Sequence, residues 1–273
     1  MAVLSTALAV KALAACPDDA AVQALAADIL AAVPGQPLDV ATMTDGLCAQ
    51  DKLVAILAQK RGGRIGYKAG LTSEAAQKAF GVGEPIRGVL FADMMLDDGA
   101  KVPAKFGALP RFEADLIAVV ADAGINEATT PAEALKHLSS IHPFIELPDL
   151  VIDAPSKLSG PVLTSINAGA RLGVLGKAIA VEPTDAFLAS LAHMKIEVVD
   201  QNGNELAAAT GSAVLDQPLN SILWLRKNGV TFKPGDMVSL GSFGPLLKPA
   251  PGLTATVTYD GLPGNPAVSV VFE

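Results

Sequence analysis

Two carboxylates inside an apolar segment constrain the fold of this chain more than any other feature. They are Glu113 and Asp115, in the stretch RFEADLIAVV over residues 111–120. Side chains at positions i and i+2 of a strand leave the same face, so the stretch predicts a strand with two adjacent acids on one face. Such alternation is most often the solvated face of a half-buried strand. If that face is buried instead, the two charges repel, and a cation or a shared proton must offset the cost.

A third acid lies in a second apolar stretch and extends the pattern. It is Glu146, in the stretch PFIEL over residues 143–147. Carboxylates offer oxygen ligands only, which a hard divalent cation prefers, and three of them leave coordination positions open for water and substrate. Glu113, Asp115 and Glu146 are therefore candidate ligands for Mg²⁺ or Mn²⁺.

Composition narrows the class of partner. Of the 273 residues, 51% are hydrophobic but only 4% are aromatic, so the core must be built mainly from Ala, Val, Leu and Ile. The net charge is −8 and the isoelectric point about 4.9, without a cluster of Lys and Arg. Phosphate binding needs a basic surface, so this balance argues against a nucleic acid or an anionic membrane as partner. The chain also has no apolar run of the roughly 18 residues that a membrane span needs.

The N-terminal segment and the cysteines bear on location. Residues 1–16 are rich in alanine and predict a helix, because alanine is the best helix former. Residues 13–16, LAAC, resemble a bacterial lipoprotein cleavage box, but Lys11 interrupts the apolar stretch and no basic residue precedes it, the reverse of an export signal. Cys16 and Cys48 form neither a CxxC motif nor a disulfide framework, which fits a reducing compartment. The prediction is a cytoplasmic protein.

The chain divides into a helical part and a mostly β part. Residues 20–33 and 43–61 have helical spacing of apolar residues, and from residue 62 onward glycines and β-branched residues become frequent. We therefore predict an α+β fold, with a helical N-terminal segment over residues 1–62 and a mixed β domain over residues 63–273. Further predicted elements are a helix over 131–138 with a Thr130/Glu133 capping box, a helix over 185–193, a strand over 194–199 before an Asn-Gly hairpin turn, a helix over 215–227, and short strands over 237–272.

Four glycine-containing motifs carry groups that suit chemistry on an anion. Lys68 lies between glycines in GYKAGLTS, residues 66–73, where it can anchor an anion or exchange a proton if partial burial lowers its pKa. A solvated surface lysine is the alternative. Asp93 follows an apolar strand in GVLFADM, residues 88–94, where a turn or cap residue is the alternative. Gly211-Ser212 and Gly241-Ser242 enter turns whose free N–H groups can receive an anion.

The order of these motifs resembles that of one enzyme superfamily. In sequence they are GYKAGLTS, GVGEPIRGVLFADM, PRFEADLIAVV, PFIELPD, TGSAVLDQPLNSILWL and LGSFGP. This order is similar to the 2-hydroxypenta-2,4-dienoate (2-keto-4-pentenoate) hydratase and 4-oxalocrotonate decarboxylase branch of the fumarylacetoacetate hydrolase superfamily. The resemblance covers roughly residues 20–273. It implies a mixed β-roll flanked by helices and assembled into homo-oligomers.

The resemblance also implies a role for each matching residue. The family's metal-binding acids fall on Glu113, Asp115 and Glu146, and its metal would be Mg²⁺ or Mn²⁺. Its glycine-flanked lysine falls on Lys68 and the aspartate after its GVLF-type strand on Asp93, and these two are the candidates for moving protons. The residues that match its substrate-binding turns are Asn167, Gly211, Ser212 and Ser242.

Several positions depart from the family pattern. Asp115 stands where this branch usually has Glu, one methylene longer, and the arginine that usually follows the third acid is missing. Ile166 stands where an aspartate usually precedes the Asn, and Leu240 where a Thr often precedes Gly-Ser. Arg87 stands where the pattern often has a non-basic residue; it either reaches a second carboxylate of a dicarboxylic substrate or is solvated.

The hypothesis that follows is a metal-dependent hydratase that adds water to a 2-hydroxy-2,4-dienoate and yields a 4-hydroxy-2-oxo acid in aromatic catabolism. Three alternatives remain open: a decarboxylase of the 4-oxalocrotonate type, a non-catalytic oxo-acid-binding protein, and an exported solute-binding protein. Hydrolytic C–C cleavage, the superfamily's other reaction, generally uses a His/Glu pair. The three histidines, His137, His142 and His193, lie in or beside helical connections, which makes hydrolysis the weaker interpretation.

Overall fold

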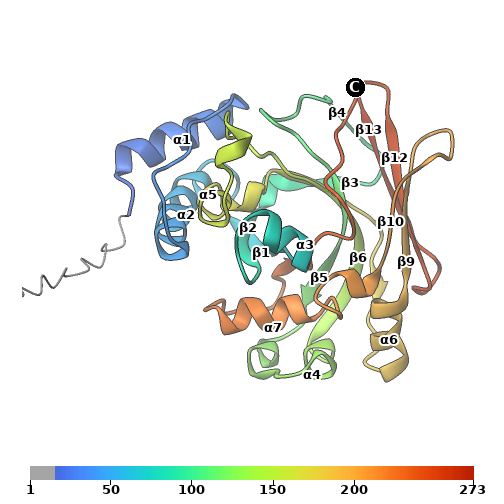
Figure 1. Ribbon diagram of the computed structural model, residues 1–273. Helices are drawn as coiled ribbons and strands as arrows, with labels where there is room; N and C mark the ends of the chain where they lie inside the picture. Colours follow the sequence, from blue (N-terminus) through green and yellow to red (C-terminus); the bar gives the residue numbers. More distant parts are fainter. Residues whose placement is uncertain (1–15) are drawn as a thin grey trace, which may run out of the picture.

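Two β-sheets and seven α-helices make up the part of the chain that this computed structural model describes, residues 16–273 (Figure 1). The helix predicted over residues 1–16 lies outside the described residues, apart from Cys16. None of the helices in residues 16–273 has the length and hydropathy of a membrane-spanning segment. The α-helices are α1 (Asp19–Ala31), α2 (Met43–Ala58), α3 (Glu74–Ala79), α4 (Pro131–Leu135), α5 (Gly160–Ser165), α6 (Asp185–His193) and α7 (Asn220–Lys227).

The larger sheet has eight strands and mixes parallel with antiparallel pairs. Its order is β2-β1-β11-β5-β6-β7-β3, and β8 pairs separately with β6. The strands β1 and β11 run parallel, while β5 is antiparallel to both β11 and β6. The bounds are β1 (Arg64–Gly70), β2 (Ile86–Phe91), β3 (Met95–Asp97), β5 (Glu113–Val120), β6 (Leu138–Leu147), β7 (Leu172–Leu175), β8 (Ile179–Ala180) and β11 (Met237–Ser239).

The smaller sheet has five strands in the order β10-β9-β12-β13-β4. It packs against the larger sheet through one buried core, which holds Leu116 from β5 together with Val198 and Val257 from the smaller sheet. The two sheets lie beside one another in Figure 1, with α4, α6 and α7 at one end. The bounds are β4 (Ala100–Val102), β9 (Lys195–Val199), β10 (Glu205–Thr210), β12 (Thr254–Asp260) and β13 (Ala267–Phe272). Mixed sheets with flanking helices confirm the predicted α+β class.

Four predicted helices are shorter in the structure than in the prediction. Two of them end early: α1 ends at Ala31 rather than at residue 33, and α2 at Ala58 rather than at residue 61. The Thr130/Glu133 capping box is present, but α4 ends at Leu135, because residue 138 already begins β6. The helix predicted from residue 215 begins only at Asn220, since Leu215 and Asp216 have φ angles of 48° and 63°, which a right-handed helix does not allow. The prediction for α6 is confirmed at both ends.

The two N-terminal helices share a core with the larger sheet. Leu25 of α1 and Leu53 of α2 are buried in one cluster with Ile86 and Val89 of β2. The second of these helices ends at Ala58, and β1 begins at Arg64. Because the apolar faces of these helices are buried against the sheet, the segment positions β2, which lies next to the strand that carries Lys68.

A disulfide joins Cys16 to Cys48, which the sequence analysis did not predict. The two residues are 32 positions apart, but α1 packs on α2 and brings their Cα atoms to 5.6 Å. The pairing depends on this tertiary packing, so no motif in the sequence marks it. The interpretation that the cysteines fit a reducing compartment is therefore not supported by the structure.

Tyr259 ties the smaller sheet to the two strands that carry the acids. Its hydroxyl donates to the Asp115 carbonyl at 2.6 Å and also lies 3.1 Å from the Phe144 carbonyl. The Phe144 amide in turn donates to the same hydroxyl at 3.3 Å. Burial raises the pKa of this tyrosine, so it stays neutral and can keep its donor role. Its hydrogen bonds hold β5 and β6 beside one another at the level of Asp115.

We expect Tyr259→Phe to lower the free energy of unfolding by about 1–3 kcal/mol, because the buried carbonyls lose their donor. Tyr67→Phe is the matched control: the Tyr67 ring packs on Phe232 and under Arg64, and the described residues supply no partner to its hydroxyl. That variant should change stability by less than about 0.5 kcal/mol. Urea unfolding followed by circular dichroism measures both, and equal effects of the two substitutions would contradict the role given to Tyr259.

Candidate active site

The larger sheet brings together side chains from distant parts of the sequence. Lys68 lies in β1, Glu113 and Asp115 in β5, and Glu146 in β6, and β11 runs between β1 and β5. In a flat sheet, three interstrand spacings of about 14 Å in total would separate β1 from β6. The Lys68 ammonium nevertheless contacts the Glu146 carboxylate. The sheet therefore curls toward the face that carries these side chains.

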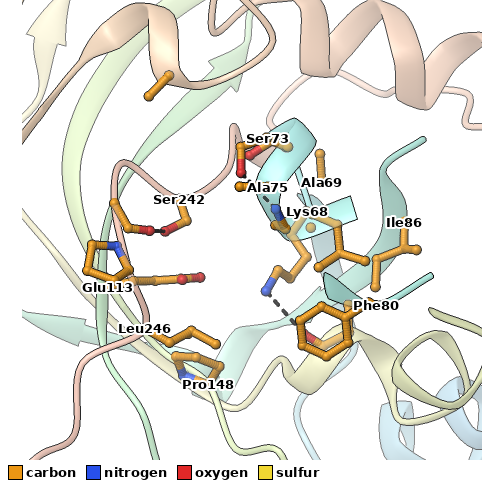
Figure 2. Close-up of a pocket in the computed structure, with 18 of the residues that line it drawn as sticks. Lys68, Ala69, Ser73, Ala75, Phe80, Ile86, Glu113, Pro148, Ser242 and Leu246 are labelled. Carbon is orange, nitrogen blue, oxygen red and sulfur yellow. Dashed lines mark hydrogen bonds between the residues drawn. The ribbon is translucent and has the colours of Figure 1, made fainter. Parts of the chain in front are cut away.

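A cavity of about 660 Å³ opens beside this cluster. Lys68 and Glu113 line it and point toward one another across it (Figure 2). Apolar residues such as Phe80 and Leu246 form much of the remaining wall. Asp115 and Glu146 are not among the lining residues, so the charged cluster extends from the cavity wall into the interior.

Lys68 is held in place by its surroundings. Its side chain is 4% exposed, and its ammonium donates to the Glu146 carboxylate and, at 3.2 Å, to the Ala168 carbonyl. Gly88 faces it from β2, where a Cβ atom would lie 2.5 Å from the Lys68 Cγ. A glycine at this position therefore makes the space in which the lysine lies. The surface-lysine interpretation is wrong.

The two strand acids are buried, so the solvated-face interpretation is also wrong. Glu113 is 8% exposed and Asp115 fully buried, and Glu146, which pairs directly with Glu113 across β5 and β6, is 2% exposed. Asp115 accepts hydrogen bonds from the Ser239 hydroxyl at 2.5 Å and the Gly241 amide at 2.9 Å. The shorter aspartate is thus fitted to the polypeptide turn that follows β11.

Burial and mutual repulsion shift the pKa values of the cluster. Burial, together with the charge of Glu146, raises the pKa of Glu113 well above its usual range and that of Asp115 to about 7. Burial alone would lower the pKa of Lys68, but the carboxylates of Glu146 and Glu113 outweigh it, and the pKa is raised. The lowered pKa that partial burial would give this lysine is therefore not found, and the shift has the opposite direction. Lys68 is therefore an ammonium at neutral pH.

The three acids supply the donor atoms that a metal ion needs, but their side chains are not grouped around one common point. One oxygen of Glu146, Oε2, is buried without a hydrogen-bond partner, and oxygen-only donors suit a hard divalent cation. Within residues 16–273, however, no three Asp, Glu, His or Cys side chains are grouped as a metal would need them. The reason is visible in the contacts: Glu146 is paired with Lys68, and Asp115 is bound to Ser239 and Gly241.

The residues predicted to bind substrate have different surroundings. Ser242 lines the cavity, and its hydroxyl lies close enough to Glu113 to favour the ionised carboxylate. Asn167 is buried, and its side-chain amide makes two hydrogen bonds to Val89, at 2.8 and 2.9 Å. Asn167 therefore fixes the turn, with left-handed φ angles at Asn167 and Ala168, that presents the Ala168 carbonyl to Lys68.

Gly211 and Ser212 lie at the edge of this region. The Gly211 amide donates to the Met194 carbonyl at 3.0 Å, and a Cβ at this position would lie 1.8 Å from the Leu191 carbonyl oxygen. The glycine thus permits close packing, and its N–H is already used. Ser212 lines an adjacent hollow of about 380 Å³, while its hydroxyl lies 2.9 Å from that of Thr210, which does line the main cavity.

The structure does not bring Asp93 or Arg87 to the cavity. Asp93 is half exposed and paired with Arg61 at 3.0 Å, beyond the end of β2. The Arg87 guanidinium donates to Asp51 at 2.5 Å and to Gln50 at 3.0 Å. It is therefore already paired and does not lie where a substrate carboxylate in the cavity could bind it. No histidine in residues 16–273 lines the cavity.

Three contributors were missed by sequence reasoning. They are Ser239, which binds Asp115; Ala168, whose carbonyl binds Lys68; and Tyr259, which holds β5 and β6. A serine two residues before Gly241 in a predicted strand has no distinguishing pattern. An alanine that acts through its carbonyl has none either, because any residue supplies that group.

Solved structures with the same fold support the architecture. A 4-oxalocrotonate decarboxylase from Pseudomonas putida G7, complexed with magnesium and adipate, superposes with a TM-score of 0.81, 22% identity and coverage of 93% of this chain and 97% of that one. A fumarylpyruvate hydrolase from Pseudomonas aeruginosa, in complex with Mn²⁺ and pyruvate, gives a TM-score of 0.57 at 16% identity and covers 76% of this chain and 89% of that one. The fold is that of the fumarylacetoacetate hydrolase superfamily.

Sequence comparison narrows this class. No protein-family model matches the chain. A curated relative, 2-keto-4-pentenoate hydratase 1 from Dechloromonas aromatica, strain RCB, is 30% identical over 261 residues, which cover 90% of this chain and 95% of the relative. This chain belongs to the 2-keto-4-pentenoate hydratase family, as the order of its motifs predicted.

The raised pKa of Asp115 predicts a pH-dependent effect of its removal. The pKa of an unfolded aspartate is about 3.9, whereas burial and the charge of Glu146 raise the pKa of Asp115 to about 7 in the folded protein. Because the native state binds this proton more tightly, ionisation of Asp115 lowers the free energy of unfolding as the pH rises from about 4 to about 7. We expect Asp115→Asn to gain stability relative to the metal-free wild type across that interval, as measured by urea unfolding.

Asp200→Asn is a control of opposite sign. Hydrogen bonds from Asn204 lower the pKa of Asp200, so its ionisation stabilises the folded state, and this variant should lose stability relative to the wild type as the pH rises. An Asp115→Asn difference that stays flat, or that follows the direction of Asp200→Asn, would contradict the assignment.

Proposed function

We propose that this protein is a divalent-metal-dependent hydratase of aromatic catabolism that adds water to a 2-hydroxy-2,4-dienoate and yields a 4-hydroxy-2-oxo acid. The observation that carries the proposal is the buried Lys68, placed among three carboxylates at the wall of a cavity, in a chain whose curated relatives are hydratases. Hydrolysis finds no support, because no histidine of the described chain lines the cavity.

We propose Glu113, Asp115 and Glu146 as the residues that would hold Mg²⁺ or Mn²⁺. The neighbours with magnesium and Mn²⁺ support a divalent ion, and the unpartnered Oε2 of buried Glu146 supports the choice of residues. When bound, such an ion supplies a Lewis acid that stabilises negative charge on the substrate's 2-oxygen. The charge of such an ion would also balance the carboxylates that the single Lys68 ammonium leaves without a positive partner.

The chain's own residues account for the handling of protons. Hydration requires that a proton leaves the 2-hydroxyl and one is added at C5, after which water adds its hydroxyl at C4 and its hydrogen at C3. Lys68 faces the cavity as an ammonium, since neighbouring carboxylates raise its pKa, so it is the proposed acid for protonation at carbon. The Ala168 carbonyl and Gly88 position this group. Glu113 lies opposite it, near Ser242, whose hydroxyl donates to the Gly244 carbonyl at 3.0 Å. The role predicted for Asp93 has no counterpart in this geometry.

Location and assembly are proposals of the same kind. We propose a cytoplasmic homo-oligomer, which fits the small-molecule chemistry and the acidic net charge of −8. A cytoplasmic location requires that the Cys16–Cys48 disulfide persists in a reducing compartment.

The test of the reaction is the ultraviolet absorbance of freshly generated 2-hydroxypenta-2,4-dienoate. Chelator-treated protein should leave the dienol band unchanged, and addition of Mg²⁺ or Mn²⁺ should produce loss of the band with a 4-hydroxy-2-oxo acid as product. Loss of the band with release of CO₂ would instead assign a decarboxylase. An unchanged band with metal bound would reject catalysis in favour of oxo-acid binding.

Lys68→Met separates the acid from the metal site. The methionine retains most of the shape of the lysine stem but carries no proton, so we expect turnover to fall by about 10²-fold or more. Mn²⁺ affinity, followed by titration calorimetry, should be unchanged or higher, because the cation that competes for Glu146 is gone. Parallel loss of turnover and Mn²⁺ binding, in a variant that still unfolds cooperatively, would reject the separate roles.

A further inference from the structure

The cavity offers a ligand only one cation. Lys68 and Glu113 are the only charged side chains among its lining residues, all of which lie in the described part of the chain. Arg87, the residue that sequence analysis considered for a second carboxylate, is bound to Asp51 and Gln50 outside the cavity. A ligand with a carboxylate at each end would therefore bury its far charge without a cation, which is costly.

Much of the cavity wall is apolar, and its large side chains come from four separate segments. Ile86 begins β2, Leu163 lies in α5, Phe80 follows α3, and Leu246 lies in the loop between β11 and β12. Figure 2 shows Phe80 and Leu246 beside the space between Lys68 and Glu113. Apolar groups on several sides of one space bind an apolar ligand, because both lose contact with water.

One of these side chains is unusually exposed. Leu246 is 39% exposed, and only Leu30 and Val33 are comparable among the large hydrophobic residues of the described chain. Leu30 and Val33 belong to or follow α1 and do not line the cavity, whereas Leu246 does. An apolar group in the cavity would remove Leu246 from water and gain the free energy of that burial.

The cavity is also larger than a five-carbon acid needs. 2-Hydroxypenta-2,4-dienoate has eight non-hydrogen atoms. If each atom took the ~30 Å³ that a whole water molecule takes in liquid water, the acid would occupy about 240 Å³. The cavity measures about 660 Å³, so more than half of it remains. Small residues create this space, among them Ala75, Ala76 and Ala209 on the wall.

We propose that the substrate carries an apolar substituent of several carbons at the end remote from its 2-oxo acid group, in place of hydrogen or a second carboxylate. This inference rests on the proposed function for the reacting end of the molecule, since Lys68 and the acids must receive that end. It extends the proposed function by naming the chemistry of the other end. It also separates this chain from a decarboxylase of 4-oxalocrotonate, which carries a carboxylate at both ends.

Binding of saturated 2-oxo acids tests the inference without turnover. Calorimetric titration of the Mg²⁺-loaded protein would compare 2-oxopentanoate, 2-oxooctanoate and 2-oxoheptanedioate. We expect 2-oxooctanoate to bind roughly tenfold more tightly than 2-oxopentanoate, because three further methylenes are buried at least in part. 2-Oxoheptanedioate should bind no more tightly than 2-oxopentanoate. If 2-oxooctanoate has no advantage, or if the diacid binds as tightly, the inference is overturned.

Leu246→Arg and its matched control test whether the apolar substituent of the substrate, here called the apolar tail, lies against Leu246. An arginine at the cavity wall should shift the ratio of affinities by about tenfold or more toward 2-oxoheptanedioate, because the far carboxylate gains a cation. Leu30→Arg makes the same change at a residue of similar exposure on α1, outside the cavity, and should leave the ratio as in the wild type. Equal ratios in the two variants would show that the tail does not lie against Leu246.

Turnover distinguishes failure of this inference from failure of the proposed function. The substrates are 2-hydroxy-2,4-dienoates that carry hydrogen or n-propyl at C5, and we expect kcat/KM to be higher for the propyl compound. A higher value for the unsubstituted compound would overturn the apolar tail while leaving the hydratase in place. Turnover of neither, with the expected order of 2-oxo acid binding, would overturn the hydratase and leave the apolar tail in place.

Discussion

The structure depends on a lysine buried among three carboxylates. Lys68 has one positive charge, and Glu113, Asp115 and Glu146 offer up to three negative ones, all in a region almost closed to water. Ionisation of the whole set would leave a buried surplus of negative charge, which the interior cannot solvate. The metal-free protein meets this by holding protons, as the raised pKa values of Glu113 and Asp115 indicate. A divalent cation would instead neutralise the buried excess of negative charge directly.

The fold supplies what this cluster needs to persist. The larger sheet curls until β1 and β6 can touch through their side chains, and Tyr259 of the smaller sheet holds the acid-bearing strands in register. On the other side, the N-terminal helices bury their apolar faces against β2, and β2 supplies Gly88, which leaves room for Lys68. The smaller sheet therefore fixes the strands that carry the acids, and the N-terminal helices fix the strand that faces Lys68. The charged wall of the cavity follows from the curl of the larger sheet, whereas most of the apolar wall comes from α5, the residue after α3 and the loop between β11 and β12.

Much of this was predictable from the sequence, and the failures have physical causes. Strand periodicity placed Glu113 and Asp115 on one face, and motif order gave the superfamily fold, but alternation alone could not tell a buried face from a solvated one. The smaller sheet packs on the opposite face of β5, with Ala114 and Leu116. The acid face is buried because the larger sheet curls to bring Lys68 against it, and because the core shared with the N-terminal helices includes Ile117 of the same face. The glycine neighbours of Lys68 indicated a close approach of backbone, yet the direction of its pKa shift came from Glu146, 78 residues away in the chain. Asp93 matched its motif, but Arg61 pairs with it outside the cavity.

Anomalous diffraction from a crystal grown with Mn²⁺ tests the central claim most directly, since it locates the ion independently of any assumed chemistry. The account predicts a peak among the carboxylates of Glu113, Asp115 and Glu146, with the Lys68 ammonium no longer paired with Glu146. A peak elsewhere, or no peak at saturating Mn²⁺ with the Lys68–Glu146 pair intact, would contradict it.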